Sequence, residues 1–387
     1  MTYAGKKVKE LRKLRGLTQR ELAEHSGVSL SLIRKLEQGE REGARMETLH
    51  KIARPLRVNT MELVAEPSEA GPVAGAHELW APVREELLRP PAPEGSDRPT
   101  PSGVAAVFEH AAGLYRDHHF AELAATLPGL LRDADALDEN GRGVRVKVLQ
   151  LAAGALTHTR QFDIAELVVR RSLADARDRL EGSASVNTLA WLLIRQGRLD
   201  EALTLSTQWA DELEPRMSRA TASELAAWGL MLLRASGAAV RNNQPGAASD
   251  MKKLARSAAV AIGQEIQVGH ETVRTFGPTT VRYLTIEDAM VIDKPDNALR
   301  LARQVPRFAV RPTISVRNRH GLDVANAHAR LGQYAEAFGK LHEIQAASPE
   351  WFPNQTPAQD ALRLIVDGRR SLTPEMRSMA EVLHMQL

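Results

Sequence analysis

A short segment near the N-terminus, residues 17–40, constrains this chain more than any other feature. It reads LTQRELAEHSGVSLSLIRKLEQGE. Thr18 can cap a first helix, and Glu21, three residues later, completes a capping box. Gly27 supplies a turn where a positive φ costs little, and Ser29 can cap a second helix. Two short helices joined by a glycine-containing turn form a helix-turn-helix unit, which this segment therefore predicts.

Helical patterns flank this unit on both sides. One runs from Lys6 to Arg15, another surrounds Ile52, and Asn59 can begin a fifth helix. The words LTQ, ELA, SGVS and IRKLEQG, at these spacings, resemble the lambda-repressor class, the family often called Xre. The resemblance covers residues 5–64 and implies a five-helix lambda-repressor-like domain that binds double-stranded DNA.

The resemblance also implies where DNA is contacted. The start of the first central helix would meet phosphate, and the second central helix would enter the major groove. Lys35 could donate to guanine, and Leu30 could contact a thymine methyl group. The implied base contacts are Ser29, Leu30, Ser31, Arg34 and Lys35, and the implied phosphate contacts are Thr18, Gln19, Arg41 and Arg45. Arg12 and Glu37 match a partly buried salt bridge of the family, so we expect them to serve structure rather than DNA binding.

The charge balance divides the chain in the same place. Residues 1–64 hold 14 Lys and Arg against 8 Asp and Glu, whereas the remainder holds 37 against 40. A basic N-terminal domain on a mildly acidic body favours a polyanion as partner of that domain, although a solvated basic surface would give the same count.

Several classes of chemistry find no support in the sequence. The chain has no cysteine, which excludes disulfides, zinc–thiolate sites and a cysteine nucleophile. No apolar run reaches the roughly 18 to 20 residues of a membrane span, so we expect a soluble, cytoplasmic protein without a membrane partner. His320, Asp323 and His328 share a helix without an evident third metal ligand. We expect no metal, no cofactor, no catalytic residues and no enzyme activity.

The rest of the chain divides into a linker and a helical body. Residues 65–103 are rich in proline, and within them His77–Leu88 can form one short helix that packs on a neighbour. Residues 104–387 are helical again, with Ala, Leu, Arg and Glu dominant. The expected domains are therefore 1–64 for DNA binding, 65–103 as linker and 104–387 for sensing and dimerisation.

The body carries a tetratricopeptide-like repeat, in which a small residue in the first helix precedes a glycine turn. Two stretches fit it well, Ser185–Pro215 with its turn at Gly197 and Asn318–Pro349 with its turn at Gly332. Weaker turns can be placed near His118, Arg160, Asn243 and Lys294, and capping helices near 357–370 and 374–385. The pattern predicts an all-α fold whose body is a tetratricopeptide-like α-solenoid of five or six hairpins.

The first helices of such a solenoid line a concave groove. Counting along the two strong repeats places six side chains on that face, namely Asn187, Trp191, Arg195, Arg319, Asn326 and Arg330. Asparagine can pair with a peptide backbone and arginine with a carboxylate, so these residues can form an effector groove. Alternatively, Trp191 belongs to the core and the polar side chains only solvate the surface.

The combination of the two domains resembles the peptide-pheromone regulators of Gram-positive bacteria and, still more, related actinobacterial regulators of this size. The second resemblance includes PRMSRAT at 215–221, RTFGP at 274–278 and RNRH at 317–320. It implies a sequence-specific transcription regulator that forms a homodimer, reads a palindromic operator and binds a peptide or small-molecule effector. The alternative is a tetratricopeptide adaptor that docks a protein partner, with DNA binding constitutive or secondary.

Overall fold

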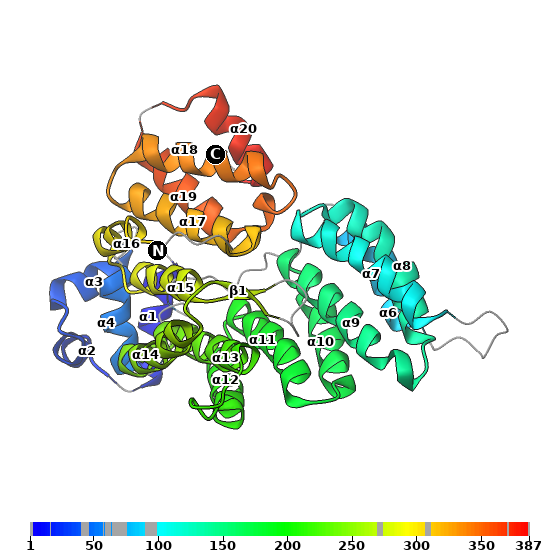
Figure 1. The fold of residues 1–387 in the computed structure, drawn as a ribbon. Coiled ribbons are helices and arrows are strands. Elements are labelled where there is room, and N and C mark those ends of the chain that lie inside the picture. The colour runs from blue at the N-terminus through cyan, green and yellow to red at the C-terminus, as the bar shows by residue number, and fades with distance from the viewer. Residues whose placement is uncertain are drawn as a thin grey trace.

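The structure is a computed structural model of an almost entirely helical protein (Figure 1). It describes residues 3–15, 17–39, 46–56, 58, 63, 76–89, 99–268, 274–305, 311–369 and 371–385. The all-α class predicted from the sequence is confirmed, with an N-terminal helix-turn-helix domain and a solenoid-like helical body. Among the described residues, no helix is long and apolar enough to cross a membrane.

The N-terminal domain contains α1 (Tyr3–Leu14), α2 (Gln19–Ser26), α3 (Leu30–Gln38) and α4 (Met46–Leu56). Thr18 and Glu21 form the predicted capping box at the start of α2, and Gly27 ends that helix with φ at 65°. A small apolar core holds the helices together through Val8, Leu22, Ile33, Leu36 and Ile52. The fifth helix expected from Asn59 falls outside the described residues.

The helix expected between the prolines forms as α6 (Ala76–Leu88) and packs on the body. Its Trp80 and Val83 are fully buried in the main core. Glu86 accepts a hydrogen bond of 2.7 Å from Arg132, and Arg84 donates one of 2.6 Å to Asp163. Hydrophobic burial and ion pairs therefore fix this helix to the first hairpins of the body.

The described part of the body consists of six antiparallel helix hairpins and two further helices. The hairpins are α7 (Pro101–Arg116) with α8 (Phe120–Asp135), α9 (Arg142–His158) with α10 (Phe162–Asp175), α11 (Arg179–Arg195) with α12 (Leu199–Leu213), α13 (Ala222–Arg241) with α14 (Pro245–Ile262), α15 (Pro278–Val291) with α16 (Pro295–Ala302), and α17 (Ile314–Arg330) with α18 (Tyr334–Ala347). Short 3₁₀ helices span Glu139–Gly141 and Phe352–Asn354, and the predicted capping helices are α19 (Thr356–Asp367) and α20 (Pro374–Val382).

Every hairpin turn contains a residue with positive φ, which confirms the weak repeats as well as the two strong ones. The strong repeats use Gly197 at 76° and Gly332 at 74°. The other turns use His118 at 62°, Arg160 at 63°, Asn243 at 60° and Asp293 at 55°. Because the turns adopt the same left-handed geometry, those without glycine are structurally equivalent to the two that contain it.

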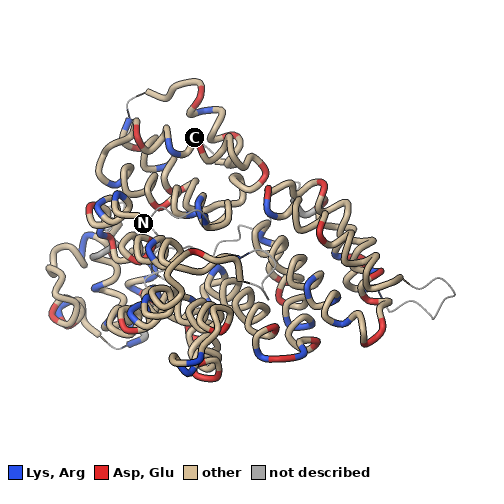
Figure 2. The backbone as a smooth tube through the Cα atoms, viewed as in Figure 1, with Lys and Arg blue, Asp and Glu red and all other residues tan. Residues whose placement is uncertain are grey.

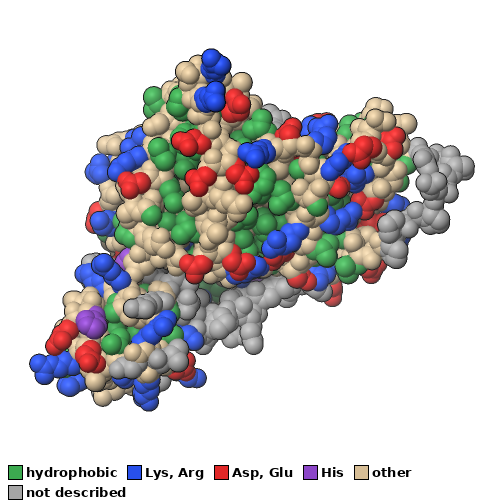
Figure 3. All heavy atoms as spheres, turned by 90° about the horizontal axis from the view of Figure 1, so that it is seen from below, with side chains coloured by type: hydrophobic (Ala, Val, Ile, Leu, Met, Phe, Trp, Pro, Cys, Tyr) green, Lys and Arg blue, Asp and Glu red, His purple; other side chains and the backbone are tan. Residues whose placement is uncertain are grey.

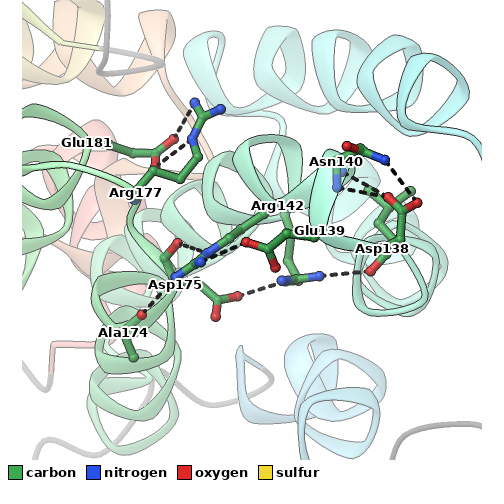
Figure 4. A network of polar contacts seen from close by, with 11 residues as sticks. Asp138, Glu139, Asn140, Arg142, Ala174, Asp175, Arg177 and Glu181 are labelled. Carbon is green, nitrogen blue, oxygen red and sulfur yellow. Dashed lines mark hydrogen bonds and ion pairs between the residues drawn. The ribbon is translucent and has the colours of Figure 1, made fainter.

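Polar contacts hold the two helices of the second hairpin, α9 and α10, together (Figure 4). Arg142, at the start of α9, donates to the backbone oxygen of Asp175 at 2.6 Å and to the Glu139 carboxylate at 2.9 Å. Arg145 donates to the Asp175 carboxylate at 2.7 Å. These bonds fasten the loop before α9 to the end of α10. Over the body as a whole, acidic and basic residues are interspersed (Figure 2).

A two-stranded antiparallel hairpin, β1 (Ile266–Gln267) with β2 (Thr275–Phe276), interrupts the helical pattern and was not predicted. Phe276 is fully buried against α13. A Cβ atom at Gly229 would lie 2.1 Å from the Phe276 ring, so only glycine allows β2 to lie this close to the helix. This packing positions Arg274, immediately before β2, near the inner helices.

The last hairpin returns to the first two, so the body closes on itself (Figure 1). We call this contact the closing seam; it joins His118, His158 and Arg160 to Ser315, Ser348, Trp351 and Thr356. The two ring nitrogens of His118 bond to the hydroxyl groups of Ser348 at 3.0 Å and Ser315 at 2.7 Å. Trp351 donates to Nδ1 of His158 at 3.0 Å, and Arg160 donates to Thr356 at 2.7 Å. The Trp351 ring also stacks on His118, with 5.4 Å between the ring centres.

Candidate functional sites

The outer face of α3 is a candidate DNA interface. Ser29, Ser31, Arg34 and Lys35 are exposed, and Leu30 is half-buried. The opposite face of α3 is fixed in the core, because Ile33 and Leu36 are fully buried. The helix therefore presents its polar side chains outward from a rigid support, as insertion into a major groove requires. In Figure 3 this domain is the small lobe at lower left, with Lys and Arg side chains on its surface.

The start of α2 has a more constrained arrangement than the sequence indicated. The Thr18 side chain accepts a hydrogen bond from the backbone N–H of Glu21, so it serves first as a helix cap. Gln19 donates to the Glu37 carboxylate at 2.8 Å, which fixes its side chain and leaves one amide N–H for other bonds. Arg41 and Arg45 lie outside the described residues.

The expected pair of Arg12 and Glu37 forms and supports this interface from inside. Arg12 donates two hydrogen bonds to Glu37, at 2.7 and 2.9 Å, and the Glu37 side chain is only 1% exposed. Burial alone would raise the pKa of Glu37, but hydrogen bonds from Arg12 and Gln19 outweigh burial and hold it below its ordinary value. The pair links α1 to the end of α3 and to the start of α2.

The second candidate site is a cavity of about 240 Å³ on the inner side of the body. The first helix of each of the six hairpins contributes to its lining, from Tyr115 on α7 to Asp323 on α17. Trp351 and Gln355, which follow the last hairpin, line it as well. The cavity therefore lies where the concave groove of a solenoid was expected, and the closing seam borders it.

The cavity lining is strongly cationic. It includes two carboxylates, Glu287 and Asp323, against five arginines, which are Arg195, Arg234, Arg241, Arg274 and Arg319. Glu287 pairs with Arg241 at 2.5 Å and with Arg319 at 3.3 Å. Burial and the neighbouring charge of Glu287 raise the pKa of Asp323 to about 8, so at pH 7 this group is mostly neutral.

A flat aromatic surface lies beside these cations. The guanidinium groups of Arg195 and Arg274 each lie 5.7 Å from the centre of the Trp191 ring. The His158 ring meets Trp191 edge-on with 4.7 Å between ring centres, and Tyr283 stacks on His320 at 4.0 Å. Burial lowers the pKa of His320 to about 4, so it is neutral at pH 7. Cation–π contacts with the Trp191 ring partly compensate Arg195 and Arg274 for the hydration that they lose.

The structure gathers three of the six predicted groove residues, Trp191, Arg195 and Arg319, in the lining of this cavity. Asn187 is fully buried behind it and accepts a bond of 2.6 Å from Arg234, which itself lines the cavity. Asn326 and Arg330 lie outside the lining. Asn326 donates to the backbone oxygen of Pro357 at 2.8 Å, and Arg330 donates to that of Met290 at 3.0 Å.

The prediction from sequence missed Arg234, Arg241 and Arg274. Arg234 and Arg241 are seven residues apart on α13, so they share one face of that helix. The hairpin of α13 has Asn243 instead of glycine at its turn, and this weak repeat gave no register for counting. Arg274 belongs to the word RTFGP and lies outside the helical hairpins, so counting along the repeats could not place it.

Comparison with known proteins identifies the N-terminal domain. A family model described as helix-turn-helix matches residues 8–63, which confirms the domain predicted there. Curated proteins give no significant match.

Among solved structures, the chain is similar to PlcR from Bacillus thuringiensis in complex with the peptide PapR7 and DNA. That match has 15% identity, covers 78% of this chain and 95% of that chain, and has a TM-score of 0.38. ComR from Streptococcus suis is similar at 15% identity, covering 95% of this chain and 96% of that chain, with a TM-score of 0.30. Residues 8–63 of the chain are thus a helix-turn-helix domain of a DNA-binding regulator.

Proposed function

We propose that this protein is a sequence-specific transcription regulator whose body binds an effector, a peptide or a small molecule, in the arginine-lined cavity. The observation that carries the proposal is the pairing of two surfaces on one chain. The exposed face of α3, with Ser31, Arg34 and Lys35, suits base contacts. The inner face of the body, with its half-buried cations around a cavity, suits a ligand.

The effector would act through the arrangement of two helix-turn-helix domains. A single domain of this size contacts little DNA, so we propose a homodimer that reads a palindromic operator with two copies of α3. In this scheme residues 1–64 bind DNA, 65–103 connect, and 104–387 sense and dimerise. Ligand binding would change DNA affinity only through a different affinity for the two arrangements of the dimer.

DNA binding is tested by fluorescence anisotropy of the full chain on DNA from upstream of its own gene, titrated against salt. We expect tight binding that is lost on scrambled DNA and in the Ser31→Ala/Lys35→Ala variant. The matched control is Arg256→Ala, which removes an exposed cation from α14 and should leave binding unchanged. Equal affinity for both DNAs in all three proteins would contradict sequence-specific recognition by α3.

The same protein serves to test the oligomeric state and the kind of molecule that changes DNA affinity. Sedimentation should show a dimer with and without operator DNA, and a monomer under both conditions would contradict the homodimer. A change of DNA affinity that requires a protein partner, with none produced by peptides or small molecules, would favour the adaptor alternative.

A further inference from the structure

We infer that the ligand of the cavity is a compact organic anion with a flat apolar part, rather than an extended peptide. The inference rests on the proposed function and names the chemical class of its effector. It depends on four features of the lining: the charge of Arg195, the unsatisfied donor of Arg319, the aromatic and aliphatic surface beside them, and the size of the cavity.

Arg195 is one cationic donor that lines the cavity. Its guanidinium lies 3.5 Å from the backbone oxygen of Asn354 and over the rings of Phe162 and Trp191, at 5.6 and 5.7 Å. Among the described residues, no carboxylate lies within ion-pair distance of it. Burial, with the charges of Arg319 and Arg160, lowers the pKa of Arg195 to about 9, so it still carries its charge at pH 7. A half-buried cation that packs on apolar rings without a counter-charge is partly desolvated, and an anionic ligand would offset that cost.

Arg319 faces the same cavity from α17. One of its terminal N–H groups bonds to Glu287 at 3.3 Å, whereas its buried Nε has no hydrogen-bond partner among the described residues. An unsatisfied buried donor beside a cavity is a place where a ligand oxygen gains a charge-assisted hydrogen bond. Arg195 and Arg319 thus present cationic donors from α11 and α17 to the same cavity.

The cavity also has an aromatic and aliphatic surface that suits the apolar part of a ligand. Trp191, Tyr283 and Trp351 line the cavity together with an aliphatic wall of Ile194, Leu230, Leu233, Leu284 and Val316. Flat rings stack on such surfaces, and the aliphatic side chains exclude water. A purely polar anion such as phosphate would leave this wall unused, so the lining favours an aromatic or otherwise flat carboxylate or sulfonate.

The size of the cavity suits a compact ligand. The closing seam borders the cavity, and Trp351 contributes to both. A space of about 240 Å³ is on the order of 10 Å across if compact, whereas seven extended residues span roughly 23 to 25 Å. An extended peptide of seven residues would therefore reach well beyond this space, whereas a ligand of two or three rings would fit within it.

The probe for this test is 8-anilinonaphthalene-1-sulfonate, compared with N-phenyl-1-naphthylamine, which has the same rings and no charge. Both are titrated into the full chain and followed by fluorescence. We expect saturable binding of the sulfonate at least about tenfold tighter than that of the neutral amine. Arg195→Gln should weaken sulfonate binding about tenfold and leave the amine unchanged, because one charge-assisted bond is lost. The control Arg256→Gln removes an exposed cation on α14 and should change neither.

Three outcomes would overturn the inference. These are equal affinity for the two probes, no saturable sulfonate binding, and displacement of the bound sulfonate by octa-glutamate but not by 2-naphthoate. The ratio of the two affinities in the unaltered protein keeps the test valid if Arg195→Gln fails to fold. Failure here is distinct from failure of the proposed function, because the DNA anisotropy experiment uses neither probe.

Discussion

The helix-turn-helix domain and the body place their candidate functional residues in opposite ways. In the first, Ser31, Arg34 and Lys35 point outward from one helix, and the buried charge of Glu37 is paired inside the domain. In the body, the candidate residues point inward from six helices, and half-buried Arg195 has no carboxylate beside it among the described residues. A surface for a large polyanion needs a rigid, self-sufficient support. A cavity for a small ligand can leave charge for that ligand to balance.

The largest expected effect follows from breaking the internal pair of the helix-turn-helix domain. Glu37→Ala leaves Arg12 partly buried without its carboxylate and removes the acceptor of Gln19. We expect the free energy of unfolding of this domain to fall by about 3 to 5 kcal/mol. Hydrogen exchange of the amides of α1–α4 measures this loss. Tryptophan fluorescence follows only the body, because all five tryptophans lie outside residues 1–64, and should be unchanged.

The matched control for this prediction is Glu24→Ala. Glu24 pairs with Arg20 on the surface of α2, where the two side chains are 63% and 81% exposed. An exposed pair contributes little to stability, so the exchange rates should stay as they are. Equal protection in Glu37→Ala and Glu24→Ala would show that the Arg12–Glu37 pair does not support the domain.

The next largest effect is a loss of stability of the body as the pH falls. Burial, with the charge of His119, lowers the pKa of His118 to about 4, whereas an unfolded histidine has a pKa near 6.5. The unfolded chain therefore binds more protons between these values, and the body loses stability as the pH falls through this window. For His118 alone the loss between pH 7 and pH 5 is about 2 kcal/mol. Urea unfolding followed by tryptophan fluorescence at several pH values measures it.

Neighbouring histidines provide the comparison for this pH dependence. His118→Gln should reduce the fall in stability between pH 7 and pH 5 by about 2 kcal/mol, whereas His119→Gln, at an exposed position one residue away, should preserve it. The pKa of half-buried His50 is also lowered, by burial and by the charge of Arg54, which gives the helix-turn-helix domain a weaker dependence of the same sign. If stability fell equally with pH in the two variants, His118 would not be a source of the acid sensitivity of the body.

The two regions also differ in how much of them the sequence could predict. The helix-turn-helix domain depends on contacts within a few turns of helix, so caps at Thr18 and Ser29 and a glycine at position 27 were enough to place α2 and α3. The repeat turns followed from the same local rules. Trp191, Arg195 and Arg319 could be placed on the inner face because strong repeats fixed the register of α11 and α17.

The closing seam could not be predicted in this way. The contact of His118 with Ser348 joins residues 230 positions apart, and no repeat pattern contains information on how far a solenoid curves. The same holds for Arg274, which reaches the cavity because β2 packs against Gly229. Asn326 fits the repeat register, yet it bonds to the backbone of Pro357 at the start of the capping helix, a contact that the repeat does not specify.

The smallest expected effect tests the rule that the two regions share. Gly27 and Gly197 have φ at 65° and 76°, and no atom lies within 4 Å of a Cβ built on either. Substitution by alanine therefore adds backbone strain without a steric clash, at a cost of about 1 kcal/mol in each region. Hydrogen exchange should report this loss for Gly27→Ala in α1–α4, and tryptophan fluorescence should report it for Gly197→Ala in the body. Asn243→Gly, at a turn with φ of 60°, should stabilise the body by a comparable or smaller amount. A cost several times larger at Gly197 than at Gly27 would mean that the closed body transmits strain from one turn through its whole ring, and that the two regions do not obey the same local rule.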